Sequence, residues 1–436
     1  MAGNMVEALG AQGVRFLRVV WCDNANLIRA KAVHLGSIQD QLEHGVGISP
    51  AQQAVPVTAD AFVKESGLGP VGEIRLVPDW DTLTILPYAP GHARVYGDMM
   101  RDGKPWTYCP RDFLRRMVRQ AADAGITFKA AFENEFYLFE REDEVLAPVD
   151  ETLFCSVQSM NLNREFVDQL AEALLAQSIP VMQYYPESGG GQQEMSIGHT
   201  SPLEAADRQL AFRESVHAVA NQLGLKASFL PKIFLDKAGS GCHLHLSLWR
   251  DGKNLRMATE THSFIAGILH HLPALMAVTT PIPNSYRRLS PHSWSGAFTC
   301  WGMGNREAAV RVVPEPDGSE PQQFELKTMD ASANPYLALG AVIAAGLDGI
   351  KRQLEPGESV SVDPGLLSEQ EREKRGIRRL PFGLAESLGN LRGNSVLKQA
   401  MGKELAKAFI SVRSRELADL ENLELDEEVA LLLERY

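Results

Sequence analysis

Cysteine is scarce in this chain, and its few cysteines form no recognisable pair. They are odd in number, widely spaced and free of any Cys-x-x-Cys motif: Cys22, Cys109, Cys155, Cys242 and Cys300. Neither a disulfide framework nor a cysteine-built zinc site is therefore expected. Unpaired thiols of this kind are typical of a reduced, cytoplasmic protein.

Long basic runs and long uninterrupted apolar runs are also missing. Lys plus Arg number 43 against 55 Asp plus Glu, which argues against binding to nucleic acid or to an anionic membrane. No basic stretch followed by an apolar segment opens the chain, so no secretory signal is apparent. The most membrane-like stretch, residues 264–283, is interrupted by His270, His271 and Pro273. We expect a soluble protein whose partners are small solutes.

The length of 436 residues exceeds what one hydrophobic core usually organises, so two domains are expected. Residues 14–35 alternate as two strands would around Asn24-Ala25-Asn26, which predicts a hairpin at the start of a small domain. Helical spacing begins at Pro110 and ends at Gly125, so we place the domain boundary near residue 107. Beyond it, strands alternate with amphipathic helices, and the predicted architecture is α+β.

Three further helices are predicted in the larger domain. The run Ser201-Pro202-Leu203-Glu204 is typical of a capping box, with proline at the first helical position and a helix that continues to Gly224. The alanine-rich residues 337–350 predict a buried helix. Residues 396–420 predict a helix with charged faces.

Three strand-like segments carry acidic or imidazole groups at alternate positions, and they are the most informative feature of the sequence. They are residues 132–136, 242–249 and 324–327. Successive side chains of a strand point to opposite faces, so each segment has one polar and one apolar face. The polar faces comprise Glu133 with Glu135, His243 with His245 and Ser247, and Glu325 with Lys327. One side of a sheet therefore feeds a core, and the other lines a polar cavity.

A divalent metal site is the chemistry that these residues predict. Mg²⁺ and Mn²⁺ prefer oxygen ligands, tolerate some imidazole, and anchor nucleotide phosphates through a few carboxylates. Two such ions could be held by Glu133, Glu135, Glu187, Glu194, His243 and Glu325. Glu187 and Glu194 flank a glycine-rich turn, where the backbone can approach a ligand closely. Arg287, Arg288, Arg306 and Arg311 add cations that could clamp phosphate and carboxylate groups.

The order of these motifs resembles that of the glutamine synthetase family over nearly the whole chain. The motifs are Glu133-x-Glu135-Phe136, the turn from Glu187 to Glu194, residues 239–245, residues 284–288, Asn305-Arg306 with Arg311, and Glu325 followed by residues 333–337. The resemblance implies an N-terminal β-grasp domain over residues 1–106 and a catalytic ATP- and metal-binding domain over residues 107–436. It also implies a curved antiparallel sheet and a double-ring oligomer, a dodecamer, with active sites between neighbouring subunits.

The same resemblance assigns roles to single residues. Glu135, Glu187 and Glu194 would hold a first Mg²⁺ or Mn²⁺, and Glu133, His243 and Glu325 a second. Arg306 and Arg311 would help to move the γ-phosphoryl group of ATP onto the glutamate side chain, and His245 would contact phosphate. Arg288 would hold the amino-acid carboxylate, with Gly239 and Lys327 also on the substrate side. Ser247 and Trp249 would line the nucleotide side.

Two departures from the family pattern concern the nucleophile. Ammonia-using members carry a flap glutamate where this chain has Trp294, and an aspartate in an N-terminal loop that corresponds to residues 45–51, which contain no acid. An aromatic ring cannot accept a proton, but it can pack against the body of an amine or face its charge. A larger primary amine is therefore the expected nucleophile, which resembles the substrates of the family's γ-glutamyl-amine ligases.

The acid substrate is less firmly indicated, and other functions stay open. Ala238, Gln323 and Lys327 replace an asparagine and two arginines of the family, and lysine lacks the bidentate fork of arginine. Glutamate nevertheless remains the expected acid. The alternatives are an ammonia-dependent glutamine synthetase, a non-catalytic glutamine synthetase-like binding protein, and a phosphotransferase resembling the guanidino kinases. A glutamate–amine ligase is the leading hypothesis.

Overall fold

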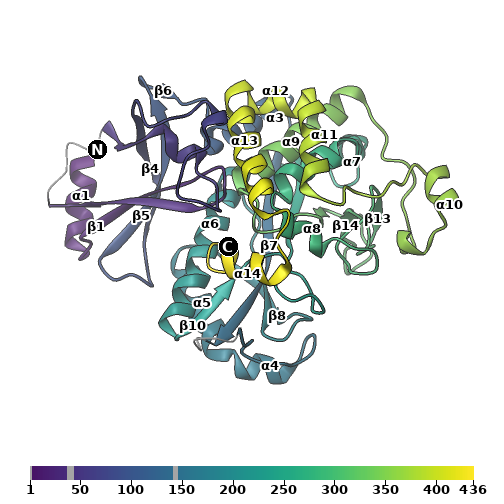
Figure 1. Cartoon of the computed structure of the whole chain (residues 1–436), viewed down its shortest axis with the longest axis horizontal. Coiled ribbons are helices and arrows are strands. Elements are labelled where there is room, and N and C mark those ends of the chain that lie inside the picture. The colour runs from purple at the N-terminus through teal and green to yellow at the C-terminus, as the bar shows by residue number, and fades with distance from the viewer. Residues whose placement is uncertain (1, 37–43, 141–145) are drawn as a thin grey trace.

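Two β-sheets organise the chain, each with its own helices (Figure 1). The computed structural model describes residues 2–36, 44–140 and 146–436. The N-terminal sheet has the strand order β2-β1-β5-β4-β3, with β6 added to β5. Its elements are α1 (Ala2–Ala11), β1 (Phe16–Cys22), β2 (Ile28–His34), β3 (Val46–Ile48), β4 (Ile74–Ile85), β5 (His92–Arg101) and β6 (Lys104–Pro105).

The first two strands confirm the predicted hairpin. They pair antiparallel from Phe16 opposite His34 to Cys22 opposite Ile28. Asn26 turns the chain with a positive φ of 65°, a conformation that asparagine tolerates better than most residues. Helix α1, which precedes the hairpin, was not expected from the sequence.

The second sheet has nine strands and carries the predicted acidic segments. Its order is β13-β14-β15-β11-β7-β9-β8, with β10 added to β7 and β12 added to β11. Every neighbouring pair is antiparallel except β13 with β14. The strands are β7 (Thr127–Glu140), β8 (Val181–Pro186), β9 (Gln192–Ile197), β10 (Leu225–Ser228), β11 (Cys242–Arg250), β12 (Lys253–Asn254), β13 (Trp301–Met303), β14 (Val310–Val312) and β15 (Phe324–Leu326). The predicted α+β fold class is confirmed.

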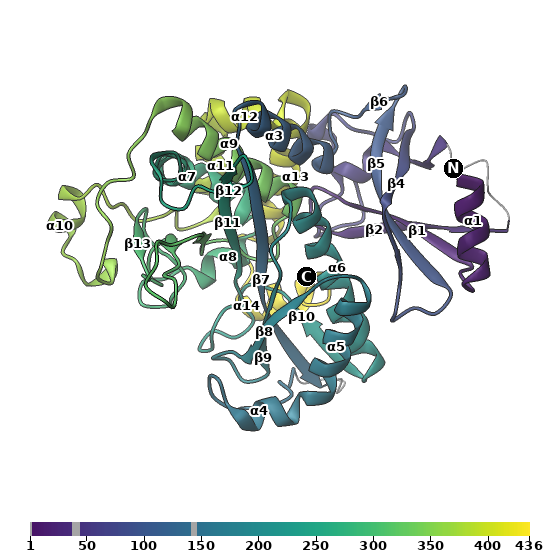
Figure 2. The same ribbon diagram turned by 180° about the vertical axis from the view of Figure 1, so that it is seen from behind.

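Long helices pack on the apolar face of this sheet and form one large core with it. From behind, Figure 2 shows the paired strands β7 and β11 running through the middle of the molecule. The long helices are α3 (Pro110–Asp123), α5 (Arg164–Ala176), α6 (Pro202–Gln222), α7 (Thr259–Thr279), α9 (Pro335–Arg352) and α13 (Lys403–Leu420). The short ones are η1 (Pro50–Ala54), η2 (Lys64–Ser66), α4 (Val157–Leu162), α8 (Pro283–Arg288), η3 (Pro364–Leu366), α10 (Glu369–Lys374), α11 (Leu384–Gly393), α12 (Ser395–Met401) and α14 (Leu425–Leu432).

The capping box predicted at the start of α6 is wrong, although the helix begins where expected. Ser201 occupies the N-cap position, but its side chain makes no capping hydrogen bond. Glu204 is held elsewhere, because its carboxylate accepts a hydrogen bond from the Thr200 hydroxyl and pairs with Arg208 at 2.7 Å. The helix predicted over residues 396–420 is also interrupted, at Gly402, where φ is +88°.

Helix α7 coincides with the most membrane-like stretch of the sequence. It is long and apolar enough to cross a bilayer, but 78% of its apolar window is buried inside the molecule, as in a core helix. It packs closely against α9, and a side chain at Gly267 or Gly349 would collide with backbone atoms of the facing helix. The apolar composition of α7 is therefore explained by helix–helix packing.

Polar contacts join the N-terminal sheet to the catalytic half. Asn26 donates to the carbonyl of Ala331 at 2.8 Å, and Asn334 donates to the carbonyl of Asp23 at 2.9 Å. These two contacts tie the hairpin turn to the start of α9 and to the segment that follows β15.

Candidate active site

Cross-strand pairing brings the predicted acidic and imidazole residues together on one face of the second sheet. Glu133 of β7 lies opposite His243 of β11, and His245 lies opposite Glu325 of β15. Residues directly opposite each other in a sheet share a face, so these four side chains meet. The same pairing sets Glu135 opposite Glu194 and Glu325 opposite Arg311. Alternation within three strands thus becomes one continuous polar surface.

Both histidines bridge the carboxylates of Glu133 and Glu325. His243 Nδ1 lies 3.1 Å from Glu133 Oε2 and 3.6 Å from Glu325 Oε2. His245 Nε2 lies 3.5 and 3.3 Å from the same two oxygens. Glu133, His245 and Glu325 offer ligand atoms within 4.8 Å of one another. The structure therefore places His245, expected at the phosphate, as close to the second metal group as His243.

Electrostatics in this group favour two ionised carboxylates. Burial alone would raise the pKa of Glu133, but hydrogen bonds from His243 and His245 hold it well below its usual value. Burial likewise opposes ionisation of Glu325, yet Lys327 and His245 lower its pKa. Against its own burial, His245 has its pKa raised to about 10 by Glu133 and Glu325. Glu325 Oε2 is buried without a hydrogen-bond partner, which suits it to a cation.

The other group combines Glu135, Glu187 and Glu194 at the glycine-rich turn. Burial and the neighbouring Glu135 raise the pKa of Glu187 to about 7. Burial raises the pKa of Glu194 well above its usual value, with Glu133 and Glu135 adding to the effect. Carboxylates crowded in this way repel one another until a cation compensates them. The donor set therefore fits divalent metal ions with oxygen ligands.

The turn between β8 and β9 requires its glycines. A side chain at Gly189 would collide with the Tyr137 hydroxyl, and one at Gly190 would lie 2.7 Å from the carbonyl oxygen of Asp150. Gly191 has a φ of +71°, a conformation that favours glycine. The tight turn sets Glu187 and Glu194 at the two ends of one hairpin.

Buried cations surround the carboxylates. Arg311 Nη1 lies 2.7 Å from Glu325 Oε1, and Lys327 Nζ lies 3.9 Å from the same oxygen. Arg288 is buried and donates from Nη2 to the carbonyls of Thr328 at 2.6 Å and Met329 at 3.1 Å, while its Nε has no partner. The structure thus keeps one donor of Arg288 free for another acceptor.

Gly239 lies directly against Arg288. A Cβ atom at Gly239 would come within 2.5 Å of Arg288 Cγ and 2.7 Å of the carbonyl oxygen of Pro231. Glycine at this position therefore leaves the space that the buried arginine occupies.

Trp294 and Arg306 lie beside each other at the rim. Trp294 is 60% exposed, and the Arg306 guanidinium carbon lies 5.9 Å from the centre of a Trp294 ring. Neither side chain belongs to the carboxylate cluster described above. The structure brings this pair together from two separate loops, residues 289–300 and 304–309.

Ser247 and Trp249 continue the polar face of β11. The Trp249 indole donates to Ser247 Oγ at 2.9 Å, and Lys129 Nζ lies 4.3 Å from the centre of a Trp249 ring. This corner combines an aromatic ring, a hydroxyl and a cation, which together could receive a nucleotide.

Several residues near the site were missed by sequence reasoning. Tyr185 donates its hydroxyl to Glu194, and Phe154 packs edge-on against Tyr185 with ring centres 5.8 Å apart. Glu307 accepts a hydrogen bond from the Trp294 backbone, and Glu73 lies beside Gly47 in the loop that has no acid of its own. Only Tyr185 had a usable signal, because it lies two residues before Glu187 on a strand.

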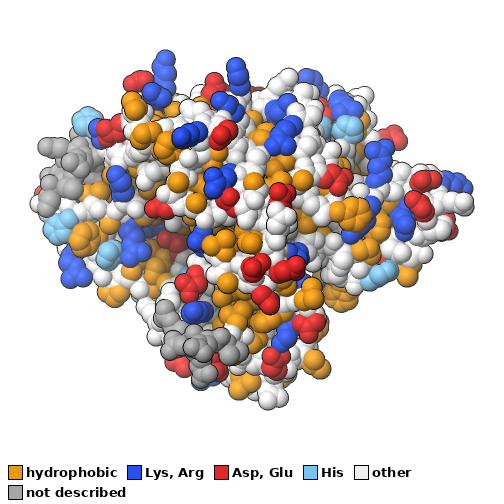
Figure 3. Space-filling model, viewed as in Figure 1, with side chains coloured by type: hydrophobic (Ala, Val, Ile, Leu, Met, Phe, Trp, Pro, Cys, Tyr) orange, Lys and Arg blue, Asp and Glu red, His pale blue; other side chains and the backbone are white. Residues whose placement is uncertain are grey.

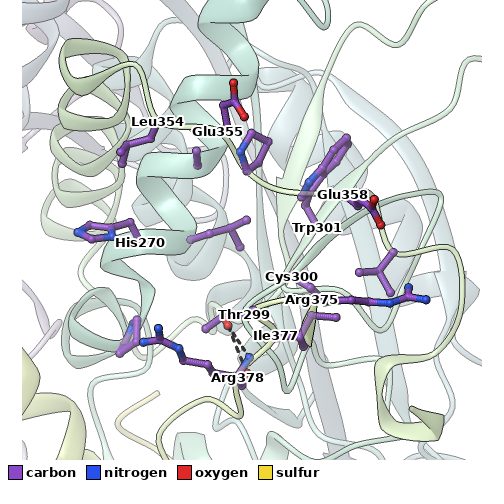
Figure 4. A pocket seen from close by; sticks show the side chains of 16 residues that line it. His270, Thr299, Cys300, Trp301, Leu354, Glu355, Glu358, Arg375, Ile377 and Arg378 are labelled. Carbon is purple, nitrogen blue, oxygen red and sulfur yellow. Dashed lines mark hydrogen bonds between the residues drawn. The ribbon is translucent and has the colours of Figure 1, made fainter. Parts of the chain in front are cut away.

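A cleft of about 270 Å³ lies apart from these residues, between α7 and the segment 354–378 (Figure 4). Trp301 lines it, and Trp301 pairs with Val310, whereas the next pair in register is Gly302 with Arg311. Because Arg311 points toward Glu325, the cleft is on the other side of β13 and β14 from the carboxylates. Figure 3 shows basic and acidic side chains interspersed over one face of the molecule.

A carboxylate- and imidazole-lined sheet face with buried cations around it has the composition of a metal-dependent phosphoryl-transfer site. Family models agree with that class. The glutamine synthetase N-terminal domain matches residues 1–106, and the glutamine synthetase catalytic domain matches residues 107–431. The chain therefore belongs to the glutamine synthetase family, whose members are ATP-dependent ligases.

Individual relatives cover almost the whole chain. It is 40% identical to gamma-glutamylpolyamine synthetase GlnA3 of Streptomyces coelicolor, over 96% of this chain and 93% of the relative. It is 32% identical to type-1 glutamine synthetase 1 of Dictyostelium discoideum, over 97% and 90%. Among solved structures, "GmaS/ADP complex-Conformation 1" superposes with a TM-score of 0.86 at 27% identity, covering 98% of each chain. "Crystal structure of novel glutamine synthase homolog" has a TM-score of 0.85 at 32% identity, covering 97% of this chain and 99% of the other.

Proposed function

We propose that this protein is an ATP-dependent ligase that joins the side-chain carboxylate of glutamate to a primary amine larger than ammonia. The reaction would pass through γ-glutamyl phosphate. The observation that carries the proposal is Trp294, an exposed indole at the flap position where ammonia-using members of the family have an acid. The names of two relatives, a gamma-glutamylpolyamine synthetase and a glutamine synthetase homologue solved with ADP, support it.

Two or more Mg²⁺ or Mn²⁺ ions would be held by the carboxylate cluster. Glu135, Glu187 and Glu194 form one ligand group, and Glu133 and Glu325 with His243 form the other; the position of His245 makes it an additional candidate ligand. When bound, such ions neutralise the phosphate oxygens of ATP and of the group being transferred. The orphaned Glu325 Oε2 and the raised pKa of Glu187 support a cation at each group.

Cationic side chains would stabilise the transferred phosphoryl group, whose charge spreads over three oxygens. Arg311 already lies at the metal group through Glu325, and Arg306 lies at the rim. Arg288, with its unpartnered Nε, is suited to the carboxylate of the amino acid. Lys327 keeps a positive charge beside Glu325 in place of an arginine.

The amine would enter between aromatic side chains. Trp294 offers an exposed indole face, and Phe154 with Tyr185 forms a second aromatic surface next to Glu194. Such surfaces attract a cationic amine and pack against its carbon chain or ring. Attack of the neutral amine on the acyl phosphate forms the amide and releases phosphate, and the lost proton passes to solvent or to a carboxylate.

The decisive measurement is phosphate release from ATP with Mg²⁺ and glutamate, with each amine of a panel added in turn. The panel comprises ammonium, polyamines, short alkylamines, ethanolamine and anilines. Selective stimulation by one larger amine, with the amide identified by mass spectrometry, is the expected result. Stimulation mainly by ammonium would contradict the proposal. Silence with every amine would favour a different acid or a non-catalytic role.

Glutamine synthesis from ammonia is the second candidate function. The presence of all six carboxylate and imidazole positions, and several relatives named glutamine synthetase, favour it. Trp294→Glu separates the two candidates, because it restores an acid at the flap. If the first proposal holds, this variant gains ammonium-dependent turnover and loses turnover of the larger amine.

We also propose that the protein is cytoplasmic and assembles into stacked rings with active sites between subunits. The family resemblance supports this arrangement, as does the division into residues 1–106 and 107–436. Light scattering gives the mass directly: a dodecamer would agree with the proposal, and a monomer at micromolar concentration would contradict it. Limited proteolysis that cuts near residue 106 would support the domain boundary.

A further inference from the structure

The flap around Trp294 has a backbone that requires support. Trp294 has a φ of 56°, His292 a φ of 62° and Gly296 a φ of 76°. Glycine adopts such angles freely, whereas a bulky residue such as tryptophan does so only where its surroundings enforce it. A group near Trp294 must therefore hold this conformation.

Glu307 is that group. Its Oε1 accepts a hydrogen bond of 2.8 Å from the Trp294 backbone N–H, and the residue is only 7% exposed. Hydrogen bonds to an ionised acceptor are shorter and stronger than those between neutral groups. No other hydrogen bond from the Trp294 backbone to a side chain occurs in the described parts of the chain.

The loop that carries Glu307 is itself anchored. Asn305 donates to the carbonyls of Val360 at 2.8 Å and Val362 at 3.0 Å, and its Oδ1 accepts from the Glu307 N–H at 3.0 Å. Asn305 thus fixes the backbone from which the Glu307 carboxylate extends. The support for Trp294 therefore rests on a loop with its own fixed contacts.

Two further contacts join this loop to the flap. Arg306 faces the Trp294 ring, so consecutive residues hold the ring and the backbone of one tryptophan. A side chain at Gly296 would lie 2.9 Å from the Cα atom of Ala309, which shows how closely the end of the flap packs on the chain after Glu307.

We propose that Glu307 is a positioning residue for the amine, which acts by holding Trp294 in its left-handed conformation so that the indole is presented to the incoming amine. The inference rests on the proposed function for the identity of the substrate, a primary amine with an alkyl or aromatic body. Without the acceptor, Trp294 relaxes toward negative φ and its ring leaves this position. The flap then offers the amine neither an acid nor a fixed aromatic surface.

The substitutions that test this role separate hydrogen bonding from charge and from volume. Glu307→Gln keeps an oxygen acceptor for the Trp294 N–H but removes the charge. Glu307→Met fills a similar volume without a strong acceptor, and Glu307→Ala removes both. Glu358→Ala, an exposed glutamate on a nearby loop, is the matched control.

Steady-state kinetics with the preferred amine give the first readout. Glu307→Met and Glu307→Ala should raise the KM for the amine about tenfold, the effect of losing one hydrogen bond to a charged group. The KM values for ATP and glutamate should stay within about twofold, and Glu307→Gln should restore most of the amine affinity. An unchanged KM for the amine in Glu307→Met would overturn the inference. An equal rise in Glu307→Gln would assign the effect to charge and overturn it too.

Fluorescence quenching gives a readout that needs no activity. The emission of Trp294, taken as the difference between each protein and its Trp294→Phe partner, should change its acrylamide quenching in Glu307→Met and not in Glu307→Gln. Identical quenching in all variants would contradict the positioning role. If the wild type used none of the amines, the proposed function would fail, yet this comparison would still decide whether Glu307 holds Trp294.

Discussion

Five acidic side chains converge on a small volume at the active site, which has consequences for individual residues. Glu133 interacts with both histidines and shares their bridge with Glu325. Replacement by alanine leaves His243 and His245 without one of their two carboxylate partners and removes a proposed metal ligand. No nearby side chain in the described parts of the chain is free to replace it.

We therefore expect Glu133→Ala to lower phosphoryl transfer from ATP about a hundredfold or more, as the loss of one preorganised electrostatic group typically does. The rate is measured as ADP formed in the presence of glutamate and the best amine. Glu172→Ala, at an exposed position of α5, should retain wild-type activity. Retained activity in Glu133→Ala would refute the metal assignment.

Metal removal tests the same cluster without activity. Since neighbouring carboxylates raise the pKa values of Glu187 and Glu194, bound cations should stabilise the fold. At a hundred times the dissociation constant, a ligand stabilises by about 2.7 kcal/mol. We expect EDTA to lower the melting temperature and Mg²⁺ or Mn²⁺ to restore it. Glu194→Gln should shrink this difference without lowering the metal-free melting temperature, and a full metal response in that variant would argue against Glu194 as a ligand.

The sequence predicted the residues of this cluster but only part of its geometry. Alternation within a strand is a local property, so the shared faces of Glu133 with Glu135 and of His243 with His245 could be read directly. The contacts of Glu307 with Trp294 and of Tyr185 with Glu194 depend on how distant segments pair and turn. The additional role open to His245 likewise appeared only when β11 was placed against β15.

At the scale of whole elements, helix starts were easier to predict than the contacts that cap them. Proline at the first helical position placed the beginnings of α3 and α6 correctly. The capping box at Ser201 failed because Glu204 has competing partners in Thr200 and Arg208. Gly402 divides the last long helical stretch through a positive φ that composition alone does not fix.

The caps of α9 and α6 make a matched pair for mutation. Asn334 Oδ1 accepts from the N–H groups of Tyr336 at 3.0 Å and Leu337 at 3.2 Å, and its amide also bonds to the Asp23 carbonyl. We expect Asn334→Ala to cost about 1–2 kcal/mol in the free energy of unfolding, as for loss of an N-cap. Ser201→Ala should cost much less, because Ser201 makes no capping bond. Equal costs in chemical denaturation would contradict this difference.

Helix α6 also carries a group that links stability to pH. Burial, with a contribution from Arg213, lowers the pKa of His217 to about 4. The unfolded chain therefore binds one more proton than the folded chain between pH 6.5 and 4, so stability from this group is present at neutral pH and lost as pH falls through that window. Glu214 and Lys226 line the same cavity.

We accordingly expect the free energy of unfolding to fall between pH 7 and pH 5, and to fall less in His217→Phe. Urea denaturation at the two pH values measures the difference. His44→Gln, at an exposed position, should keep the wild-type decrease. A decrease as large in His217→Phe as in the wild type would show that other groups cause it.

For the molecule as a whole, the two-sheet division was predictable, whereas the contacts that unite the sheets were not. A change from strand and turn signals to helical spacing near residue 107 indicates two units in the sequence. Their attachment depends on residues far apart in the chain, such as Asn26 with Ala331 and Ser228 with Tyr436. No periodicity announces such pairs.

The largest charged contribution to this attachment is the buried pair Arg413–Glu416. The two side chains are fully buried and lie 2.7 Å apart, and Glu416 Oε1 also accepts from the Val57 N–H at 2.7 Å. Helix α13 thereby holds the segment that follows η1, in the N-terminal part of the chain. Breaking a buried pair leaves an uncompensated charge, which costs far more than the net value of an exposed pair.

We expect Glu416→Gln to lower the free energy of unfolding by about 3–5 kcal/mol. Asp168→Asn, which breaks an exposed pair with Arg164 one helical turn away, should change it by about 0.5 kcal/mol or less. Because Glu416 bonds to both Arg413 and Val57, the N-terminal and catalytic parts should lose stability together. Hydrogen exchange would report this as faster exchange in both β5 and β7. Loosening confined to α13 would instead mean that the two parts are stabilised independently of this pair.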